Sequence, residues 1–200
     1  RGIVATGGNA HVLQADLAEA GAAAMLIEAF TVRAGGLDVL VNNAGGPEVL
    51  QRIELLEDPA FDQVFDLNAR SVMAMCRSSI PVLRASGPGA SIINVTSLSA
   101  RLGSGPGAAV YGAAKAFVTA MTKTLARELA PDGIRVNALS PGFVATPLHD
   151  RLSSPQMVET WVAQIPLGRA GRPDDLAGAA LFLASPTLSG FLTGQSIEVN

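Results

Sequence analysis

The sequence contains a single cysteine, Cys76, among its 200 residues, so it can form no disulfide within the chain. A lone thiol is typical of a reducing compartment, and we therefore expect a cytoplasmic protein in which Cys76 is a small buried hydrophobic residue. No apolar run reaches the length of a membrane span and no signal peptide is evident, so we expect no membrane partner.

Charged residues are also few. They make up 16% of the chain, with 17 acidic and 14 basic side chains, for a net charge of −3. No basic cluster is present, so the charge pattern does not indicate a nucleic-acid partner. His149 has no histidine or cysteine at ligand spacing, and we expect no metal site. With 48% apolar residues the sequence is that of a globular protein, and its length suits one domain over residues 1–200.

Short apolar runs alternate with longer segments of helical periodicity. The apolar runs predict strands at residues 11–15, 37–41, 92–95, 134–139 and 195–199. The helical spacing predicts helices at residues 16–33, 59–84, 111–130 and 174–184. Pro81 is expected to kink or end the second of these helices. Strands that alternate with helices indicate an α/β fold with a parallel sheet and right-handed crossovers.

Residues 92–127 carry the most specific pattern. An apolar strand ends near Ser97, a loop rich in glycine and proline follows, and Tyr111 and Lys115 then stand four residues apart. On a helix this spacing places both side chains on one face. An ammonium beside a phenol lowers the tyrosine pKa from its usual value near ~10. Such a tyrosine can exchange a proton with an alcohol or carbonyl oxygen, which a serine hydroxyl at the strand end can hold in place.

A tyrosine and a lysine four residues apart are common by chance and usually lie on the surface. Here the pair follows an N-N-A-G-G segment at residues 42–46 and a strand-end serine, and it precedes a P-G segment at residues 141–142. In this order the motifs closely resemble those of the short-chain dehydrogenase/reductase family, over essentially the whole chain. The resemblance implies a Rossmann-like, doubly wound parallel sheet and an oxidoreductase that uses NAD or NADP.

The resemblance also implies roles for individual residues. Tyr111 is expected to be the general acid/base, and Lys115 is expected to lower its pKa and to hold the ribose. Ser97 is expected to position the substrate oxygen, and Asn68 to support a proton relay. The residues expected to bind the cofactor are Asp16, Leu17, Asn43, Ala44, Gly45, Tyr111, Lys115, Pro141, Gly142, Val144 and Thr146.

Structural alternatives remain open at several of these positions. The position of Asp16 is explained equally well if it is the N-cap of the helix at residues 16–33. Asn68 can be a satisfied core amide, since a buried asparagine must be hydrogen-bonded. Residues 42–46 alone are an ordinary turn whose asparagines can tie neighbouring strands together. Residues 147–171 are expected to form the lid that shapes the substrate pocket.

One departure from the family pattern concerns the serine. Thirteen residues separate Ser97 from Tyr111, where the family usually has twelve. The residue at the usual twelve-residue spacing is Leu98, whose side chain cannot donate a hydrogen bond to a substrate oxygen. Ser97 follows Asn94, Val95 and Thr96 as the family serine does, so we assign the role to Ser97 with a longer loop and keep Ser99 as the alternative.

A second departure is the lack of a G-x-x-x-G-x-G phosphate loop, and with it of the first βαβ portion. Two explanations stay open. Either the 200 residues belong to a longer chain whose phosphate-binding portion is disordered without cofactor, or the chain lacks that unit. We favour the first, because the core would otherwise be open on one side of the sheet. The residues that distinguish NAD from NADP are missing with it.

The sequence therefore predicts an NAD(P)-dependent oxidoreductase that moves a hydride between nicotinamide and a small carbonyl or secondary alcohol. The pattern is most like that of 3-oxoacyl-carrier-protein reductases. The alternative is a non-catalytic dinucleotide-binding or scaffold protein on the same fold. By resemblance we expect a homo-oligomer, a dimer or tetramer, in which the helices at residues 61–84 and 111–130 pair across a dimer face. Their apolar faces could equally be intramolecular core.

Overall fold

The computed structural model of the chain describes residues 2–148 and 153–200. In this part of the chain, four strands form one sheet in the order β1-β2-β3-β4, and all of its pairings are parallel, as the sequence predicts. The strands are β1 (Val39–Asn42), β2 (Ser91–Val95), β3 (Arg135–Pro141) and β4 (Ser196–Val199). The longer helices are α2 (Ala22–Ala34), α3 (Asp58–Phe65), α4 (Ser71–Ser86), α6 (Ala109–Leu129), α8 (Pro155–Ala163) and α9 (Pro173–Ala184). The short helical elements are α1 (Gly2–Ala5), η1 (Ile53–Leu55), η2 (Asp66–Arg70), α5 (Ser99–Leu102), η3 (Ala130–Asp132) and α10 (Pro186–Ser189).

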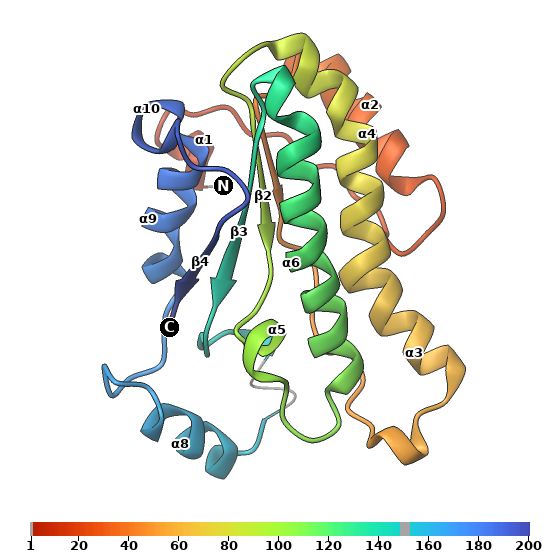
Figure 1. Ribbon diagram of the computed structural model, residues 1–200, viewed down its shortest axis with the longest axis vertical. Helices are drawn as coiled ribbons and strands as arrows, with labels where there is room; N and C mark the ends of the chain where they lie inside the picture. The colour runs from red at the N-terminus through yellow and green to blue at the C-terminus, as the bar shows by residue number, and fades with distance from the viewer. Residues whose placement is uncertain (1, 149–152) are drawn as a thin grey trace.

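Helices cover both faces of the sheet. In Figure 1, α2, α4 and α6 lie on one side of the strands and α9 lies on the other. Successive side chains of a strand point to opposite faces. Ile92 accordingly belongs to the core under α4 and α6, and its neighbour Ile93 to the smaller core under α9. Because both faces are buried, β2 reads as a nearly continuous apolar run. In β3, which is also buried, Arg135, Asn137 and Ser140 alternate with apolar residues.

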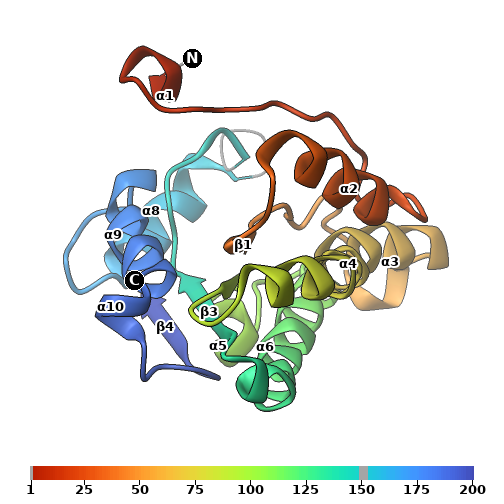
Figure 2. The ribbon, with the colours of Figure 1, turned by 90° about the horizontal axis from the view of Figure 1, so that it is seen from above.

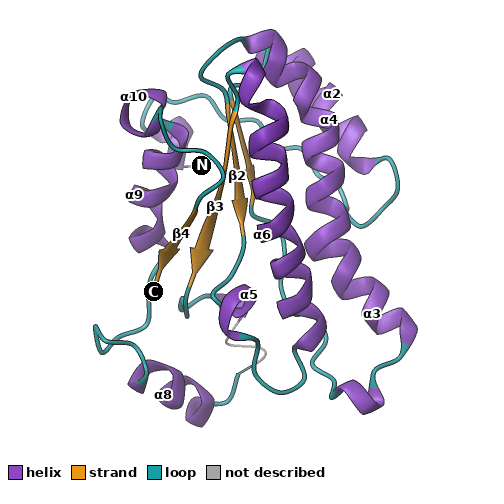
Figure 3. Cartoon of the chain, viewed as in Figure 1, coloured by secondary structure: helices purple, strands orange, loops and turns teal. Residues whose placement is uncertain are grey.

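All four strands end at the same edge of the molecule. In Figure 3 the arrowheads point toward the end where α5 and α8 lie. The register pairs Asn42 with Asn94 and Leu139 with Val95 near this edge. In an open parallel sheet, the crevice at the carboxyl edge is where ligands bind. The segments that follow β1, β2 and β3 therefore meet at one place.

The predicted strand at residues 11–15 is wrong. Val12 is 93% exposed, and Figure 2 shows the segment between α1 and α2 as an extended trace apart from the strands. A strand needs a hydrogen-bonding neighbour, and none of the four described strands pairs with this segment. The following helix also starts later than predicted, at Ala22, after Gly21 in a left-handed conformation. Asp16 is therefore not its N-cap; its carboxylate accepts a hydrogen bond from the Ala18 N–H.

The long helix predicted at residues 59–84 is present, in three joined pieces. The chain passes from α3 through the π-helical turn η2 into α4. The helix does not end at Pro81 but runs on to Ser86. Proline removes one main-chain hydrogen bond, and the burial of Cys76 before it and Leu83 after it holds the helix in place.

Candidate active site

Three segments bring the predicted catalytic residues to the carboxyl edge of the sheet. Ser97 lies two residues beyond the end of β2. Tyr111 and Lys115 lie in the first turns of α6, which packs against β2 and β3. Asn68 lies in η2, which also contacts α6. The four residues come from three separate parts of the sequence, so only the fold can gather them.

The Ser97 hydroxyl lies close enough to Tyr111 to act on the phenol as a hydrogen-bond donor, which lowers the Tyr111 pKa. Ser99, the alternative in the sequence, instead directs its main-chain N–H to the Ser97 Oγ, at 3.2 Å. That bond fixes the Ser97 side chain. The thirteen-residue spacing between serine and tyrosine is therefore compatible with a direct contact, because the short helix α5 and the following loop take up the extra residue.

Lys115 is almost fully buried, with 3% of its surface exposed. Its Nζ donates a hydrogen bond to the main-chain oxygen of Val95, at 3.1 Å, and lies 5.7 Å from the centroid of the Tyr111 ring. Burial lowers the pKa of Lys115 to about 8. An ammonium carries three N–H donors, so its bond to Val95 leaves two that could hold ligand hydroxyls.

The pKa of Tyr111 is raised, not lowered as the sequence led us to expect. Burial of the phenol is the larger effect and raises the pKa, while the hydrogen bond from Ser97 acts in the opposite direction. Lys115 does not reverse this outcome, because its nitrogen is engaged by Val95 and is itself disfavoured as an ammonium. At neutral pH Tyr111 is therefore a protonated phenol.

Asn68 is completely buried and its amide is hydrogen-bonded on both sides. Its Nδ2 donates to the main-chain oxygens of Gly46, at 2.7 Å, and Val64, at 2.8 Å. Its Oδ1 accepts from the Gly46 N–H, at 3.0 Å. The alternative of a satisfied core amide thus describes the side chain correctly. The same bonds tie the segment after β1 to η2, so Asn68 also shapes the strand-end site.

The segment after β1 is small and close to this site. Asn43, Ala44 and Gly45 are all exposed. A β-carbon added to Gly45 would lie 2.6 Å from the Asn68 Oδ1 and 3.0 Å from the Lys115 Nζ. Just before this segment, the Asn42 Nδ2 donates to the Asn94 Oδ1, at 2.9 Å. This bond confirms that an asparagine of the N-N-A-G-G segment ties two strands together.

The segment after β3 is held from two sides. The Gly142 N–H donates to the Val199 oxygen of β4, at 2.9 Å. Val144 is buried and forms an isolated parallel bridge with Gly171. Pro141 ends β3 and Thr146 lies just beyond the bridge, half-buried. Sequence reasoning missed Gly171, for which no local signal exists, because the contact is made by its main chain.

Asp16 and Leu17 stand apart from this group. Asp16 is exposed and bonds to the Ala18 N–H, and Leu17 packs against the core under α2 and α4. In the residues that the structure describes, none of these contacts involves Ser97, Tyr111 or Lys115. His149 of the predicted lid lies outside the described residues. Within residues 2–148 and 153–200, no three acidic, histidine or cysteine side chains come together where a metal could be held.

The residues at the strand ends fit one end of a nicotinamide nucleotide. A β-carbon on Gly45 would collide with Asn68 and Lys115, so this position has no room for a side chain. We call it the cradle of the site. The two free N–H groups of Lys115 suit the hydroxyls of a ribose, and the Ser97 and Tyr111 hydroxyls suit a substrate oxygen. Gly45, Lys115 and Tyr111 could therefore hold the ribose and nicotinamide.

Comparisons with known proteins agree with this geometry. The family model described as "Enoyl-(Acyl carrier protein) reductase" matches residues 2–200. A 3-oxoacyl-[acyl-carrier-protein] reductase of Synechocystis sp. is 39% identical over 200 residues, which are 99% of this chain and 77% of that protein. An uncharacterized oxidoreductase of Methylorubrum extorquens is 40% identical over 200 residues, 99% of this chain and 78% of that protein.

Solved structures give the same result. An NADH-dependent reductase, A1-R', responsible for alginate metabolism is 37% identical, with a TM-score of 0.89, over 98% of this chain and 77% of that one. The structure of that reductase complexed with NAD is 36% identical, with a TM-score of 0.84, over 96% of this chain and 74% of that one.

A parallel α/β sheet with this arrangement at its carboxyl edge is typical of a nicotinamide-dependent oxidoreductase. The chain belongs to the short-chain dehydrogenase/reductase family and is an NAD(P)-dependent enzyme. None of the helices in the described ranges combines the length and the apolar content that crossing a bilayer requires.

Proposed function

We propose that this enzyme reduces the keto group of a 3-oxoacyl substrate, with Ser97, Tyr111 and Lys115 as its catalytic residues. The observation that carries the proposal is that Ser97, Tyr111 and the buried Lys115 meet at the carboxyl edge of the sheet. The Synechocystis relative, a 3-oxoacyl-[acyl-carrier-protein] reductase by name, supports this choice of substrate class.

A protonated Tyr111 suits the reduction of a carbonyl group. The bound nicotinamide supplies the hydride when it is in its reduced form. Tyr111 holds a proton at neutral pH because burial raises its pKa, so it can donate that proton to the carbonyl oxygen as the hydride arrives. The Ser97 hydroxyl holds the same oxygen by a hydrogen bond. Lys115 binds ribose hydroxyls and supports proton return to Tyr111, with Asn68 fixing the adjoining Gly46 segment.

The cofactor contacts belong to the same proposal. We place the nicotinamide–ribose end against Gly45 with Asn43 and Ala44 beside it, and the segment from Pro141 to Thr146 opposite. The remaining cofactor residues in this proposal are Asp16 and Leu17, for which the adenine end is the expected contact. Residues 147–171, with α8, are proposed as the substrate lid of a single domain.

A two-stage assay tests this proposal. NADH and NADPH are first titrated into the protein and binding is followed by nucleotide fluorescence. A 3-oxoacyl thioester is then added, and oxidation of the nucleotide is measured. We expect binding and turnover. Binding without turnover on carbonyl substrates would favour the non-catalytic alternative, and absence of binding would remove both the cofactor and the catalytic roles.

We also propose that two copies of the chain associate through α4 and α6. An open groove of about 570 Å³ lies between these helices, away from the strand-end site. Its lining is mostly apolar and includes Met73 and Phe117, which are 41% and 39% exposed. A contiguous exposed apolar patch marks a protein contact. The proposed setting is the cytoplasm, in keeping with the free, buried thiol of Cys76.

A further inference from the structure

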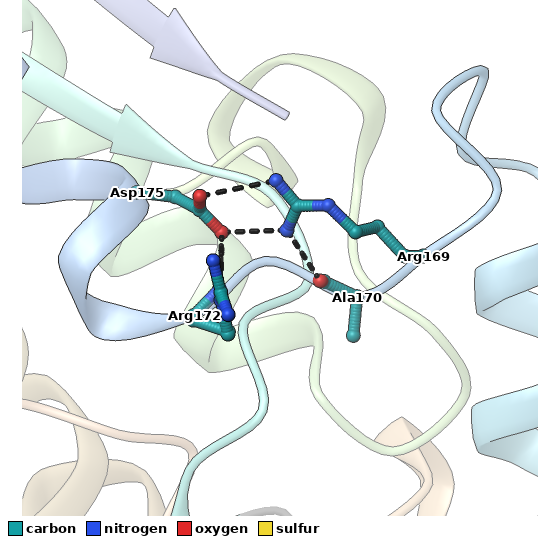
Figure 4. A network of polar contacts seen from close by, with 4 residues as sticks. All are labelled: Arg169, Ala170, Arg172 and Asp175. Atoms are coloured by element: carbon teal, nitrogen blue, oxygen red, sulfur yellow. Dashed lines mark hydrogen bonds and ion pairs between the residues drawn. The ribbon is translucent and has the colours of Figure 1, made fainter.

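A carboxylate at the start of α9 binds the end of the proposed lid. Figure 4 shows Asp175 between Arg169 and Arg172. The Arg169 guanidinium donates to both carboxylate oxygens, at 2.6 and 3.0 Å, and also to the Ala170 oxygen. The main-chain N–H of Arg172 donates to the same carboxylate, at 2.7 Å. Residues 169–172 are thus held against the first turn of α9 by one side chain.

Gly171, one of the two residues between these arginines, holds the segment after β3. The Gly171 N–H donates to the Phe143 oxygen, at 3.0 Å, and the Ala145 N–H donates to the Gly171 oxygen, at 2.9 Å. These bonds form the isolated bridge that places Val144 in the interior. The Phe143 ring also contacts Trp161 of α8, with centroids 5.2 Å apart. One end of the lid and the segment after β3 therefore share a single anchor.

The Asp175 carboxylate is suited to this task at physiological pH. Its hydrogen bonds with Arg169, and then with the Arg172 N–H, lower its pKa to about 2. The carboxylate therefore stays ionised and keeps both of its hydrogen bonds with the Arg169 guanidinium. Fork-shaped arginine–carboxylate pairs fix geometry better than single hydrogen bonds do. An amide in the same place could accept the Arg172 N–H but could not pair with both guanidinium nitrogens.

We propose that Asp175 is a positioning residue for cofactor binding: through Arg169 and Arg172 it fixes Gly171, and Gly171 fixes the main chain that presents Val144 and Thr146. This inference rests on the proposed function for the role of those two residues. Asp175 touches neither substrate nor cofactor. It sets how well ordered their binding segment is before the cofactor arrives.

The test compares Asp175→Asn with Asp132→Asn. Asp132 is a matched control, because it accepts a 2.7 Å hydrogen bond from Arg84 and the two carboxyl side chains are 25% and 31% exposed. Amide exchange at Ala145 is measured by NMR in the protein without nucleotide. Dissociation constants for NADH, the kcat at saturating NADH and the melting temperature are measured in parallel.

For Asp175→Asn we expect exchange at Ala145 and the Kd for NADH each to rise about three- to tenfold, the factor expected for net loss of one hydrogen bond in a partly exposed ion pair. The kcat at saturating NADH is expected to stay within about twofold, since the reacting residues keep their contacts. Asp132→Asn is expected to leave exchange at Ala145 and the Kd unchanged.

Unchanged exchange at Ala145 in Asp175→Asn would overturn the inference, as would an equal increase in Asp132→Asn. Arg169→Gln removes the fork from its other end and is expected to give the same increase if Asp175→Asn does not fold. A wild-type protein that binds no NADH would defeat the proposed function instead. Exchange at Ala145 would still decide whether Asp175 orders the segment.

Discussion

The Nζ of Lys115 lies 5.7 Å from the centroid of the Tyr111 ring, one helical turn along the same face of α6. Both pKa shifts favour the neutral form of the side chain: the pKa of Lys115 is lowered to about 8, and the pKa of Tyr111 is raised. Burial is the first cause in both cases. Burial of the Lys115 ammonium therefore destabilises the folded chain, and the pH dependence of unfolding can reveal this cost.

Replacement of this lysine by an apolar side chain is expected to stabilise the fold. The Lys115 pKa is about 8 in the folded chain and 10.5 for a lysine in water, a difference of roughly 2.5 pH units or about 3 kcal/mol. Loss of the bond to Val95 offsets part of this gain. In urea unfolding at about pH 7, Lys115→Met should gain about 1–3 kcal/mol over the wild type.

This gain has a definite pH dependence. Below pH ~8 both the folded and the unfolded wild type carry the proton, so the cost of burying the ammonium is fully present. As the pH rises from about 8 toward 10.5, the folded state loses its proton first and the wild type recovers stability. The advantage of Lys115→Met should therefore shrink over that interval. A difference that stays constant from neutral to alkaline pH would contradict the burial argument.

Tyr111→Phe removes only the phenolic hydroxyl. Because that hydroxyl is the proposed proton donor, kcat should fall by about 10²–10⁴-fold. The ring keeps its place on α6, so the Kd for NADH should change by less than about threefold. Initial rates and a nucleotide titration check the two expectations separately. Turnover close to that of the wild type would rule out Tyr111 as the acid.

The two serines after β2 provide an internal comparison. Ser97→Ala removes the hydroxyl that is proposed to hold the substrate oxygen and should lower kcat about 10²-fold, as expected for loss of one donor to the reacting oxygen. Ser99→Ala keeps the main-chain N–H that bonds to position 97, and its kcat should stay within about threefold of the wild type. The opposite order of effects would transfer the role to Ser99.

The sequence predicted the sheet and the helix of Tyr111 because both follow from local periodicity. Ile92 and Ile93 lie in a strand buried on both faces, and a continuous apolar run is the direct signature of that environment. Tyr111 and Lys115 share a face because a helix places residues four apart together. The family resemblance then supplied their roles, which geometry alone does not give.

The errors arose where structure depends on distant partners. Residues 11–15 have strand composition, but a strand forms only against a neighbour, and the described strands do not pair with them. The Tyr111 pKa was misjudged because spacing reveals that Lys115 is near, not how strongly the phenol is buried. The π-helical turn around Asn68 has no local sequence signal, since the turn is supported by bonds from Asn68 to Gly46.

The groove between α4 and α6 makes a prediction about assembly. Met121 lies in its lining, partly buried, and a charge there would be desolvated if a second copy covered the groove. Met121→Asp should therefore shift the protein toward a monomer in size-exclusion chromatography with light scattering. Val32→Asp, on the exposed face of α2, is the control and should leave the mass unchanged. A wild-type protein that is monomeric at micromolar concentration would contradict the proposed interface.

The space around Gly45 decides whether the strand-end site tolerates any side chain. In Gly45→Ala the β-carbon would lie 2.6 Å from the Asn68 Oδ1 and 3.0 Å from the Lys115 Nζ, at a φ of +152°. Asn68 is held by three hydrogen bonds and cannot move without breaking one, so we expect a loss of stability of about 1–3 kcal/mol and a weaker Kd for NADH.

Gly178→Ala is the matched control for this substitution. Gly178 lies inside α9, where a β-carbon meets nothing within 4 Å, so alanine should stabilise the helix by about 0.5–1 kcal/mol and leave nucleotide binding unchanged. Urea unfolding and NADH titration measure both variants. If Gly45→Ala behaved like Gly178→Ala in both assays, Gly45 would not be the cradle of the site, and the close approach to Lys115 would have no bearing on cofactor binding.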